Sequence, residues 1–485
     1  MLAVTLYTTR VLLNSLGVLD YGIYNIVGGI VAFIAFLQSA MANGYQRFFN
    51  IAIGKNDSCG LIHVFSASVS VQIIISVGFL IIAETLGIWF LNTQLIIPNE
   101  RIYAANIVYQ SVIIVFLLTM IASPCNAIVI AYERMKIFAA ISILNVLLKL
   151  VIAYIVVIGT DRLITYSILT IIVQIVITMS YVYYSFKLNP ALTFKPKFER
   201  KLMVNLLSFS GWNLFGSLAH AAKGQGLNVV LNLFFDPTIN AARGVAYQVS
   251  AGVSQFFSNF QTASRPQIIK YYAQGKYDEM LNLTYQISKF SFMLLWIIDL
   301  PLLFTSGYFI KLWIGEKMPV YAPSFTTIVL ITVTIECFAH PISTLVHATG
   351  KMRNFQTITS LAILLILPIA YCVLWLGGPP ESALYCSLFL APLVQFIRLV
   401  LVKQLVPLSI YKYMLNVIVP SCSVALVSYI AVRILLYVLP LNPIVLALVS
   451  SCIAIVVIWF VGCNRVEKNA ILKFITKKTL PNNHV

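Results

Sequence analysis

The chain has 485 residues, of which 60% are hydrophobic and only 10% are charged. Its 32 lysines and arginines outnumber its 15 aspartates and glutamates, so the formal net charge is +17. A soluble domain carries about 25% charged residues and a disordered chain has low hydrophobicity, so this composition excludes both a water-soluble enzyme and a disordered protein.

Hydrophobic segments, each bounded by charges or by Gly, Pro or Asn, recur along the whole chain. Because a transmembrane helix needs about 20 apolar residues, we predict an all-α, polytopic membrane protein with about 14 transmembrane helices. The predicted spans are residues 1–16, 23–43, 60–83, 104–129, 138–158, 163–186, 206–235, 241–262, 283–307, 322–346, 355–376, 383–402, 413–438 and 444–462.

Basic residues are divided unequally between the loops on the two sides of these spans. The loops after even-numbered spans and the C-terminal tail hold 21 lysines and arginines, and the opposite loops hold four. The positive-inside rule places the richer set in the cytoplasm. We therefore expect a multi-pass membrane protein with both termini cytoplasmic, and we attribute most of the positive charge to this topology, with no nucleic-acid partner.

Short motifs of the first half recur in the second half, 217–221 residues later. Ala52-x-Gly54-Lys55-x-Asp57 matches Ala273-x-Gly275-Lys276-x-Asp278, and Pro124 matches Pro341. The shift covers six spans, an even number, so both copies enter the membrane from the same side. Such paired bundles are typical of alternating-access transporters, and a duplicated channel or scaffold is the alternative.

This repeat divides the chain into five predicted parts. They are an N-terminal bundle (1–186), a cytoplasmic linker (187–205), a C-terminal bundle (206–402), two additional transmembrane helices (413–462) and a basic cytoplasmic tail (463–485). The first span corresponds to the seventh in this repeat. If the repeat is regular, the first span would begin about a dozen residues before Met1. We therefore expect the first helix to be truncated.

Several cations fall inside predicted spans, where a charge at the bilayer centre costs about 2.5–3.5 kcal/mol and usually faces a cavity. The candidates are Arg10, Lys149, Lys223 and Arg243, although Arg243 is also placed to cap a helix start. Together they predict a net positive cavity that binds an anionic substrate such as a diphosphate. Lys289 lies near the end of its span, and we expect its ammonium to reach the interface.

Acids, prolines and glycines inside the spans supply further candidates. Asp299 and Glu336 either carry a coupling H⁺ or Na⁺ or pair with the embedded cations. The prolines Pro124 and Pro341 and the glycines Gly224 and Gly226 are candidate hinges, with a tolerated kink as the alternative for each proline. The sequence offers no catalytic set and no metal-ligand spacing, so we expect no enzyme, no metal site and no cofactor beyond the coupling ion.

Five stretches resemble the polysaccharide (O-antigen type) flippases of the multidrug/oligosaccharidyl-lipid/polysaccharide exporter (MOP) superfamily, most of all the lipopolysaccharide-biosynthesis flippases of Bacteroides-like bacteria. The resemblance extends over nearly the whole chain. The stretches are Leu16-Gly17-x-x-Asp20-Tyr21-Gly22-Ile23-Tyr24-Asn25, Gln46-Arg47-Phe48, Ala241-Ala242-Arg243-Gly244, Leu312-Trp313-Ile314-Gly315 and Ala348-Thr349-Gly350-Lys351-Met352.

This resemblance implies two pseudo-symmetric six-helix bundles around a central cavity. It implies a flippase that moves a polyprenyl-diphosphate-linked oligosaccharide, the repeat unit of an O-antigen, capsule or exopolysaccharide, across the inner membrane by alternating access. The implied partners are this glycan, membrane lipids and polysaccharide polymerase or assembly proteins, with Arg10, Lys149, Lys223 and Arg243 engaging the diphosphate.

Two alternative functions are compatible with the same sequence. A cation-coupled multidrug antiporter of the same fold is the first, although the first half has no acid near the middle of the membrane. A membrane polysaccharide polymerase or ligase is the second, and it would need sizeable catalytic loops outside the membrane. The longest such loop, about 84–103, carries only Glu84, Glu100 and Arg101 as charged residues.

Overall fold

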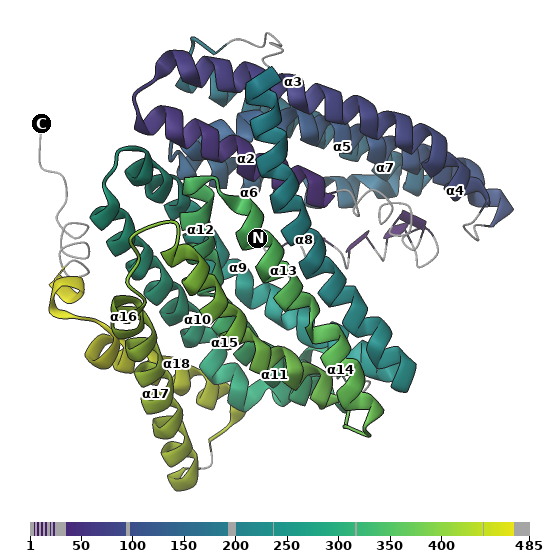
Figure 1. The fold of residues 1–485 in the computed structure, drawn as a ribbon. Helices are drawn as coiled ribbons and strands as arrows, with labels where there is room; N and C mark the ends of the chain where they lie inside the picture. The colour runs from purple at the N-terminus through teal and green to yellow at the C-terminus, as the bar shows by residue number, and fades with distance from the viewer. Residues whose placement is uncertain are drawn as a thin grey trace, which may run out of the picture. The chain divides into compact units, whose positions relative to one another are not determined.

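The chain is described by a computed structural model, in which helices joined by turns make up the described residues and no strand occurs among them (Figure 1). This confirms the predicted all-α class. The described residues are 4, 7, 8, 11, 12, 15, 16, 20, 23, 24, 35–93, 98–192, 200–235, 237–315, 318–439 and 441–469.

Contacts within the chain divide it into two compact units. Unit 1 comprises Met1–Leu218 and Ile269–Gly275, and unit 2 comprises Ala219–Ile268 and Lys276–Val485. The division into bundles, linker, additional helices and tail that the sequence predicts remains a prediction.

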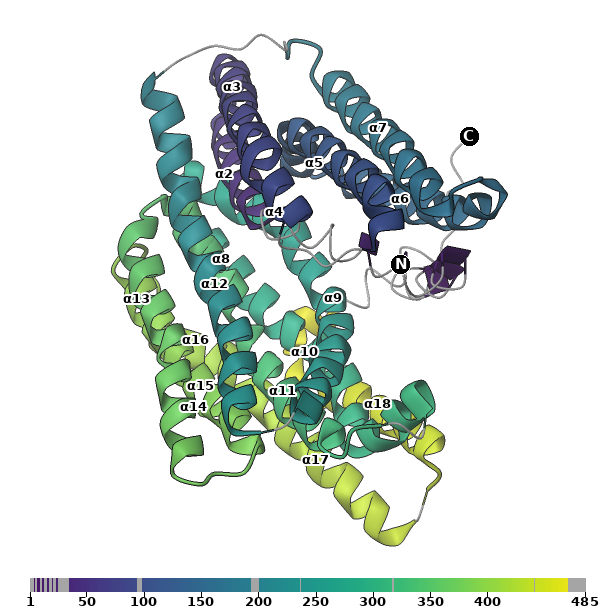
Figure 2. The same ribbon diagram turned by 90° about the vertical axis from the view of Figure 1, so that its right-hand side faces the viewer.

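Unit 1 is built around α5, which packs along α7 and also contacts α2, α3 and α6 (Figure 2). Its helices begin at polar caps: Asp57 accepts a hydrogen bond from the Gly60 N–H at the start of α3, and Asp161 caps α7 in the same way. The helices are α2 (Ala35–Gly54), α3 (Ser58–Ile82), α4 (Ile88–Thr93), α5 (Ile102–Ala131), α6 (Met135–Ile155) and α7 (Arg162–Leu188), with a π-helical segment (Ala83–Gly87) and 3₁₀ turns at Asn99–Arg101 and Val156–Ile158.

Two helices pass from one unit to the other, α8 (Arg200–Phe234) and α9 (Pro237–Ala273). The rest of unit 2 is centred on α10, which contacts α11, α17 and α18. Its helices are α10 (Tyr277–Ile314), α11 (Ala322–Glu336), α12 (Ala339–Thr349), α13 (Met352–Leu364), α14 (Ile366–Trp375), α15 (Glu381–Lys403), α16 (Ile410–Tyr413), α17 (Val419–Val438) and α18 (Pro443–Val457), with π-helical segments at Met414–Ile418 and Ile458–Gly462.

Ten helical segments in the described part of the chain are long and apolar enough to cross a membrane. They coincide with ten of the predicted spans and confirm a polytopic membrane protein. Three other predicted spans, 23–43, 206–235 and 241–262, overlap α2, α8 and α9, and the longer pair α8 and α9 carries more glycine and polar residues than the ten. The first predicted span falls largely outside the described residues.

The internal repeat is visible in the positions of the helices. Helix α10 begins 219 residues after α3 (277 against 58), α13 begins 217 after α6 (352 against 135), and α15 begins 219 after α7 (381 against 162). The tight turns repeat too, because Asn56 and Gly275 both have positive φ (55° and 73°), as do Glu133 and Gly350 (58° and 78°). Left-handed residues at matching turns are a backbone signature of the duplication.

The two prolines that match in the repeat act differently. Helix α5 continues through Pro124, whereas the corresponding span breaks between α11 and α12, just before Pro341. Proline cannot donate to the carbonyl four residues earlier, here that of Cys337, and its ring crowds that carbonyl. The freed Cys337 oxygen accepts a hydrogen bond from the Gln261 side chain at 2.9 Å. The break is thus stabilised by a partner on α9.

The helix pair α17 and α18 is fastened to α10 by polar contacts along its length. The Trp296 indole donates to Ser428 at 2.8 Å, and the Ser451 hydroxyl donates to the carbonyl of Ile297 at 3.2 Å. That carbonyl lies four residues before Pro301, so it too lacks its helical donor. Pro301 therefore leaves a backbone carbonyl of α10 free to accept a hydrogen bond from α18.

Candidate functional site

Two intramembrane charges of unit 2 meet where α8 faces α11. Lys223 on α8 forms an ion pair with Glu336 on α11, with 3.0 Å between Nζ and Oε1. The Lys223 side chain is 11% exposed and that of Glu336 is 36% exposed, so the carboxylate remains accessible from one side. The structure thus brings together two residues singled out in the sequence, 113 positions apart.

Arg243 joins α9 to α8. Its guanidinium donates to the Asn228 side chain and, at 3.0 Å, to the carbonyl of Gly224, and it lies 4.3 Å above the Tyr247 ring. Arg243 is buried, and its Nε has no acceptor among the described residues. A planar guanidinium held by several fixed contacts suits an anionic ligand with oxygen acceptors.

Two further residues join this group, which we call the α8–α11 cluster: His220, Lys223, Glu336 and Arg398. His220 and Arg398 lie close enough to act electrostatically on the Glu336 carboxylate. His220 precedes Lys223 by three residues and so shares its helix face, a spacing that could have singled it out from the sequence. Arg398 on α15 lies inside the predicted span 383–402, where its charge is the signal in the sequence.

Asp299 is separate from that cluster. It is fully buried on α10, and its Oδ2 accepts a hydrogen bond from the Thr334 hydroxyl at 2.6 Å. Its other oxygen has no partner within the part of the chain that the structure describes. Thr334 and Glu336 are two positions apart on α11 and therefore point to different sides of it, so the two acids do not share one site.

The remaining candidates lie in or near unit 1. Lys149 is an exposed residue of α6, and no hydrogen bond or ion pair of its ammonium occurs among the described residues. Arg10 lies outside the described residues. In α8 the backbone is helical through Gly224 and Gly226, and a Cβ at Gly226 would come 2.7 Å from both methyl groups of Leu367. A hinge role for either glycine remains a prediction.

A polar cavity of about 290 Å³ that the sequence did not reveal lies between α5, α6 and α7. Asn126, Asn145, Gln174 and Tyr181 contribute to its lining, together with hydroxyl groups. The side-chain oxygens of Asn126 and Asn145 are buried and lack a partner among the described residues. The lining contains no carboxylate.

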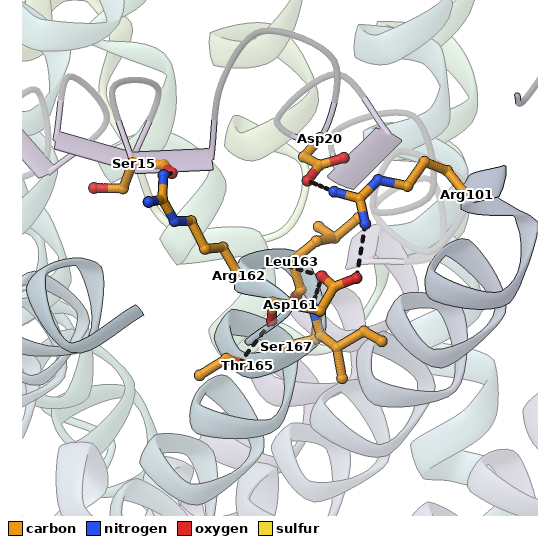
Figure 3. A network of polar contacts seen from close by, with 9 residues as sticks. Ser15, Asp20, Arg101, Asp161, Arg162, Leu163, Thr165 and Ser167 are labelled. Carbon is orange, nitrogen blue, oxygen red and sulfur yellow. Dashed lines mark hydrogen bonds and ion pairs between the residues drawn. The ribbon is translucent and has the colours of Figure 1, made fainter. Parts of the chain in front are cut away.

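Three elements of unit 1 meet at a network around Arg101 (Figure 3). The Arg101 guanidinium lies between Asp20 and Asp161, with 2.7 Å to the Asp161 carboxylate, while Arg162 donates to the Ser15 carbonyl at 2.9 Å. Burial raises the pKa of the Asp20 carboxyl although Arg101 counteracts it. Two cations of the basic-poor loops therefore have structural partners.

Comparison with known proteins gives a match at the level of the fold. No family model and no curated protein matches the chain. Among solved structures, it is similar to an outward-facing multidrug resistance MATE family transporter of the MOP superfamily, with a TM-score of 0.71 and 12% identity over 83% of this chain and 91% of that chain. It is also similar to the Vibrio cholerae MATE transporter VcmN in the bent form, with a TM-score of 0.65 and 13% identity over 86% and 95%.

A third similar structure is a MOP superfamily transporter from Pyrococcus furiosus, with a TM-score of 0.69 and 16% identity over 83% of this chain and 93% of that chain. Its description states that reverse polarity of the binding pocket suggests a different function. At these identities the comparisons establish a shared fold, that of MOP superfamily transporters. The more specific resemblance to polysaccharide flippases remains a prediction.

Proposed function

We propose that this chain is a membrane transporter that moves its cargo by alternating access between two repeated helix bundles. Three observations support the proposal: ten apolar spans, the repeated order of helices and turns, and a fold shared with transporters of the MOP superfamily. The predicted inner-membrane location is part of the proposal, and the distribution of loop charges supports the cytoplasmic placement of both termini.

The first candidate cargo is an anionic lipid, a polyprenyl-diphosphate-linked oligosaccharide. The observation that carries it is the charge balance of unit 2, where Lys223, Arg243 and Arg398 accompany Glu336 as the acid of the α8–α11 cluster. An excess of buried cations favours an anion, and guanidinium groups bind phosphate oxygens in pairs. The glycan and its assembly proteins are the partners this candidate requires.

The second candidate is a cation-coupled multidrug antiporter, and the structural comparisons support it more directly than the first. One similar structure is described as a multidrug resistance transporter. The Lys223–Glu336 pair offers an accessible carboxylate on which H⁺ or Na⁺ could act. In this candidate the cation and the drug compete for the same acid.

Glu336→Gln separates the two candidates. If the cargo is anionic, the substitution frees Lys223 from its partner, and flipping of a fluorescent polyprenyl-diphosphate lipid in proteoliposomes should persist or increase. If the protein is an antiporter, loss of the acid should abolish ethidium efflux driven by an H⁺ or Na⁺ gradient. Glu279→Gln, an exposed acid in the first turn of α10, is the matched control and should change neither assay.

Lys223→Met and Arg243→Gln test the anionic candidate from the other side. Both should stop lipid flipping at unchanged membrane abundance, whereas Lys311→Met, an exposed lysine in the last turn of α10, should not. Transport of neither cargo by the wild-type protein would overturn the transporter proposal. Elongation of a glycan by the purified protein would instead favour a polymerase or ligase.

A further inference from the structure

Unit 2 also contains a cavity of about 400 Å³, and none of its lining residues belongs to the α8–α11 cluster. Its walls are the first turns of α10, the π-helical segment Met414–Ile418 and the π-helical segment Ile458–Gly462 with the residues that follow. Single π-helical turns inside α-helices occur frequently at functional sites. Here both π-helical segments in the described part of unit 2 line the same cavity.

The rim of this cavity, the amide rim, consists of four exposed side-chain amides: Asn282, Gln286, Asn416 and Asn464. The floor holds an ion pair between Lys289 and Glu467, with 2.6 Å between Nζ and Oε2. Lys289 is 4% exposed and Glu467 is 7% exposed. That Lys289 reaches the interface remains a prediction, and in the structure its ammonium is paired with the Glu467 carboxylate.

The ion pair at the floor leaves hydrogen-bonding groups of Lys289 and Glu467 unused. An ammonium group has three donors, and the bond to Glu467 uses one of those of Lys289. The Glu467 Oε2 atom accepts both from Lys289 and from the N–H of Asn464, which leaves Oε1 without a hydrogen-bond donor among the described residues. The cavity thus presents one cation, one anion and four neutral amides to a ligand.

All three walls lie at span ends that the loop charges predict to be cytoplasmic, at the level of the inner-leaflet headgroups. Leu415 and Val461, which also line the cavity, are 47% and 43% exposed and continue onto the apolar outer surface. We propose that this cavity binds the headgroup of a membrane phospholipid of the phosphoethanolamine type, with its acyl chains against the apolar surface beside it.

The chemistry of the lining favours this headgroup over others. The phosphate accepts from the amide rim and from the free donors of Lys289, and the primary ammonium donates to the Glu467 carboxylate. A choline headgroup lacks the N–H donors for the second contact. A glycerol headgroup has no positive charge for Glu467. A zwitterion with a primary ammonium satisfies both members of the ion pair.

Native mass spectrometry of the full-length, delipidated protein tests the proposal with phosphatidylethanolamine, phosphatidylcholine and phosphatidylglycerol of identical acyl chains. The wild type should retain phosphatidylethanolamine about tenfold more tightly than the other two, the ratio that one charge-assisted contact supplies. The double variant Gln286→Leu/Asn416→Leu should weaken retention of all three lipids, because the amide rim binds the phosphate that they share. Gln404→Leu, an exposed amide at the end of α15, is the matched control and should leave retention unchanged.

The floor is tested with Glu467→Gln, which keeps the shape of the side chain and should abolish the preference over phosphatidylcholine. Should that variant fail to fold, the rim variants still test whether the cavity holds the lipid phosphate, because their residues are exposed. Soluble glycerophosphoethanolamine should not displace the lipid; displacement at equal concentration would mean a free ligand and overturn the lipid assignment. Equal retention of the three lipids by the wild type would also overturn it.

Discussion

The ion pair between Lys289 and Glu467 makes a quantitative prediction about the attachment of the C-terminal segment. Lys289→Met removes the ammonium and leaves a buried carboxylate with the Asn464 N–H as its hydrogen-bond donor. Breaking a buried pair by removing one partner costs about 3–5 kcal/mol, because the remaining charge stays desolvated. The magnitude applies here because both side chains are less than a tenth exposed.

Lys270→Met is the matched control. Lys270 pairs with Glu133 at 2.7 Å, almost the same separation, but the side chains are 16% and 40% exposed. A solvent-accessible pair contributes about 0–1 kcal/mol, so the control should be nearly neutral. The two variants thus share a chemical change and differ mainly in desolvation.

The measurement is reversible unfolding of the detergent-purified protein by titration with sodium dodecyl sulfate at pH 7. The double variant Lys289→Met/Glu467→Gln removes both charges and should be more stable than Lys289→Met alone, with a coupling free energy of about 0.5–3 kcal/mol. The reasoning is refuted if Lys289→Met and Lys270→Met cost the same, or if the double variant shows the sum of the two single costs.

Two further predictions concern helix packing. Gly226→Ala should destabilise the protein by about 1–3 kcal/mol because its Cβ would come 2.7 Å from both Leu367 methyl groups, whereas Gly224→Ala meets no atom within 4 Å and should be neutral in thermal unfolding; equal melting temperatures would contradict this. Gln261→Leu should cost about 1–3 kcal/mol because it leaves a buried carbonyl without its donor. Adding Pro341→Ala restores a backbone donor and should recover most of that loss, and a double variant as unstable as Gln261→Leu alone would show that the proline does not create the need.

The membrane helices could be predicted from the sequence because apolar runs and polar turns are local signals. The predicted span 163–186 corresponds to α7, Arg162–Leu188, and 138–158 to the continuous helical segment Met135–Ile158. The prediction was less complete for α9, which runs from Pro237 to Ala273 although only 241–262 reads as a span. Its ends are polar, and a helix that leaves the apolar layer has no hydropathy signal.

Contacts between residues that are far apart in the chain could not be predicted from a single sequence. Lys223 and Glu336 were each singled out by their charge, yet nothing in the chain specifies that two residues 113 positions apart would meet. Lys289 shows the same limit more sharply, since its partner comes from 178 positions away. A local signal did exist: Asn464-x-x-Glu467 is a capping box, in which Asn464 and Glu467 each accept from the other's N–H.

Glu336 decides between the candidate cargoes for an electrostatic reason. While it is ionised, it neutralises Lys223, and an anionic cargo must either compete with a carboxylate 3.0 Å from that ammonium or bind beside it at Arg243 and Arg398. When it takes up a proton, the same cluster gains a full positive charge and loses the competitor. Proton uptake by Glu336 therefore strengthens binding of an anion and weakens binding of a cation. The charges of the α8–α11 cluster set the direction of this coupling between protonation and cargo binding. An anionic cargo would thus travel with a proton, and a cationic drug would exchange for one.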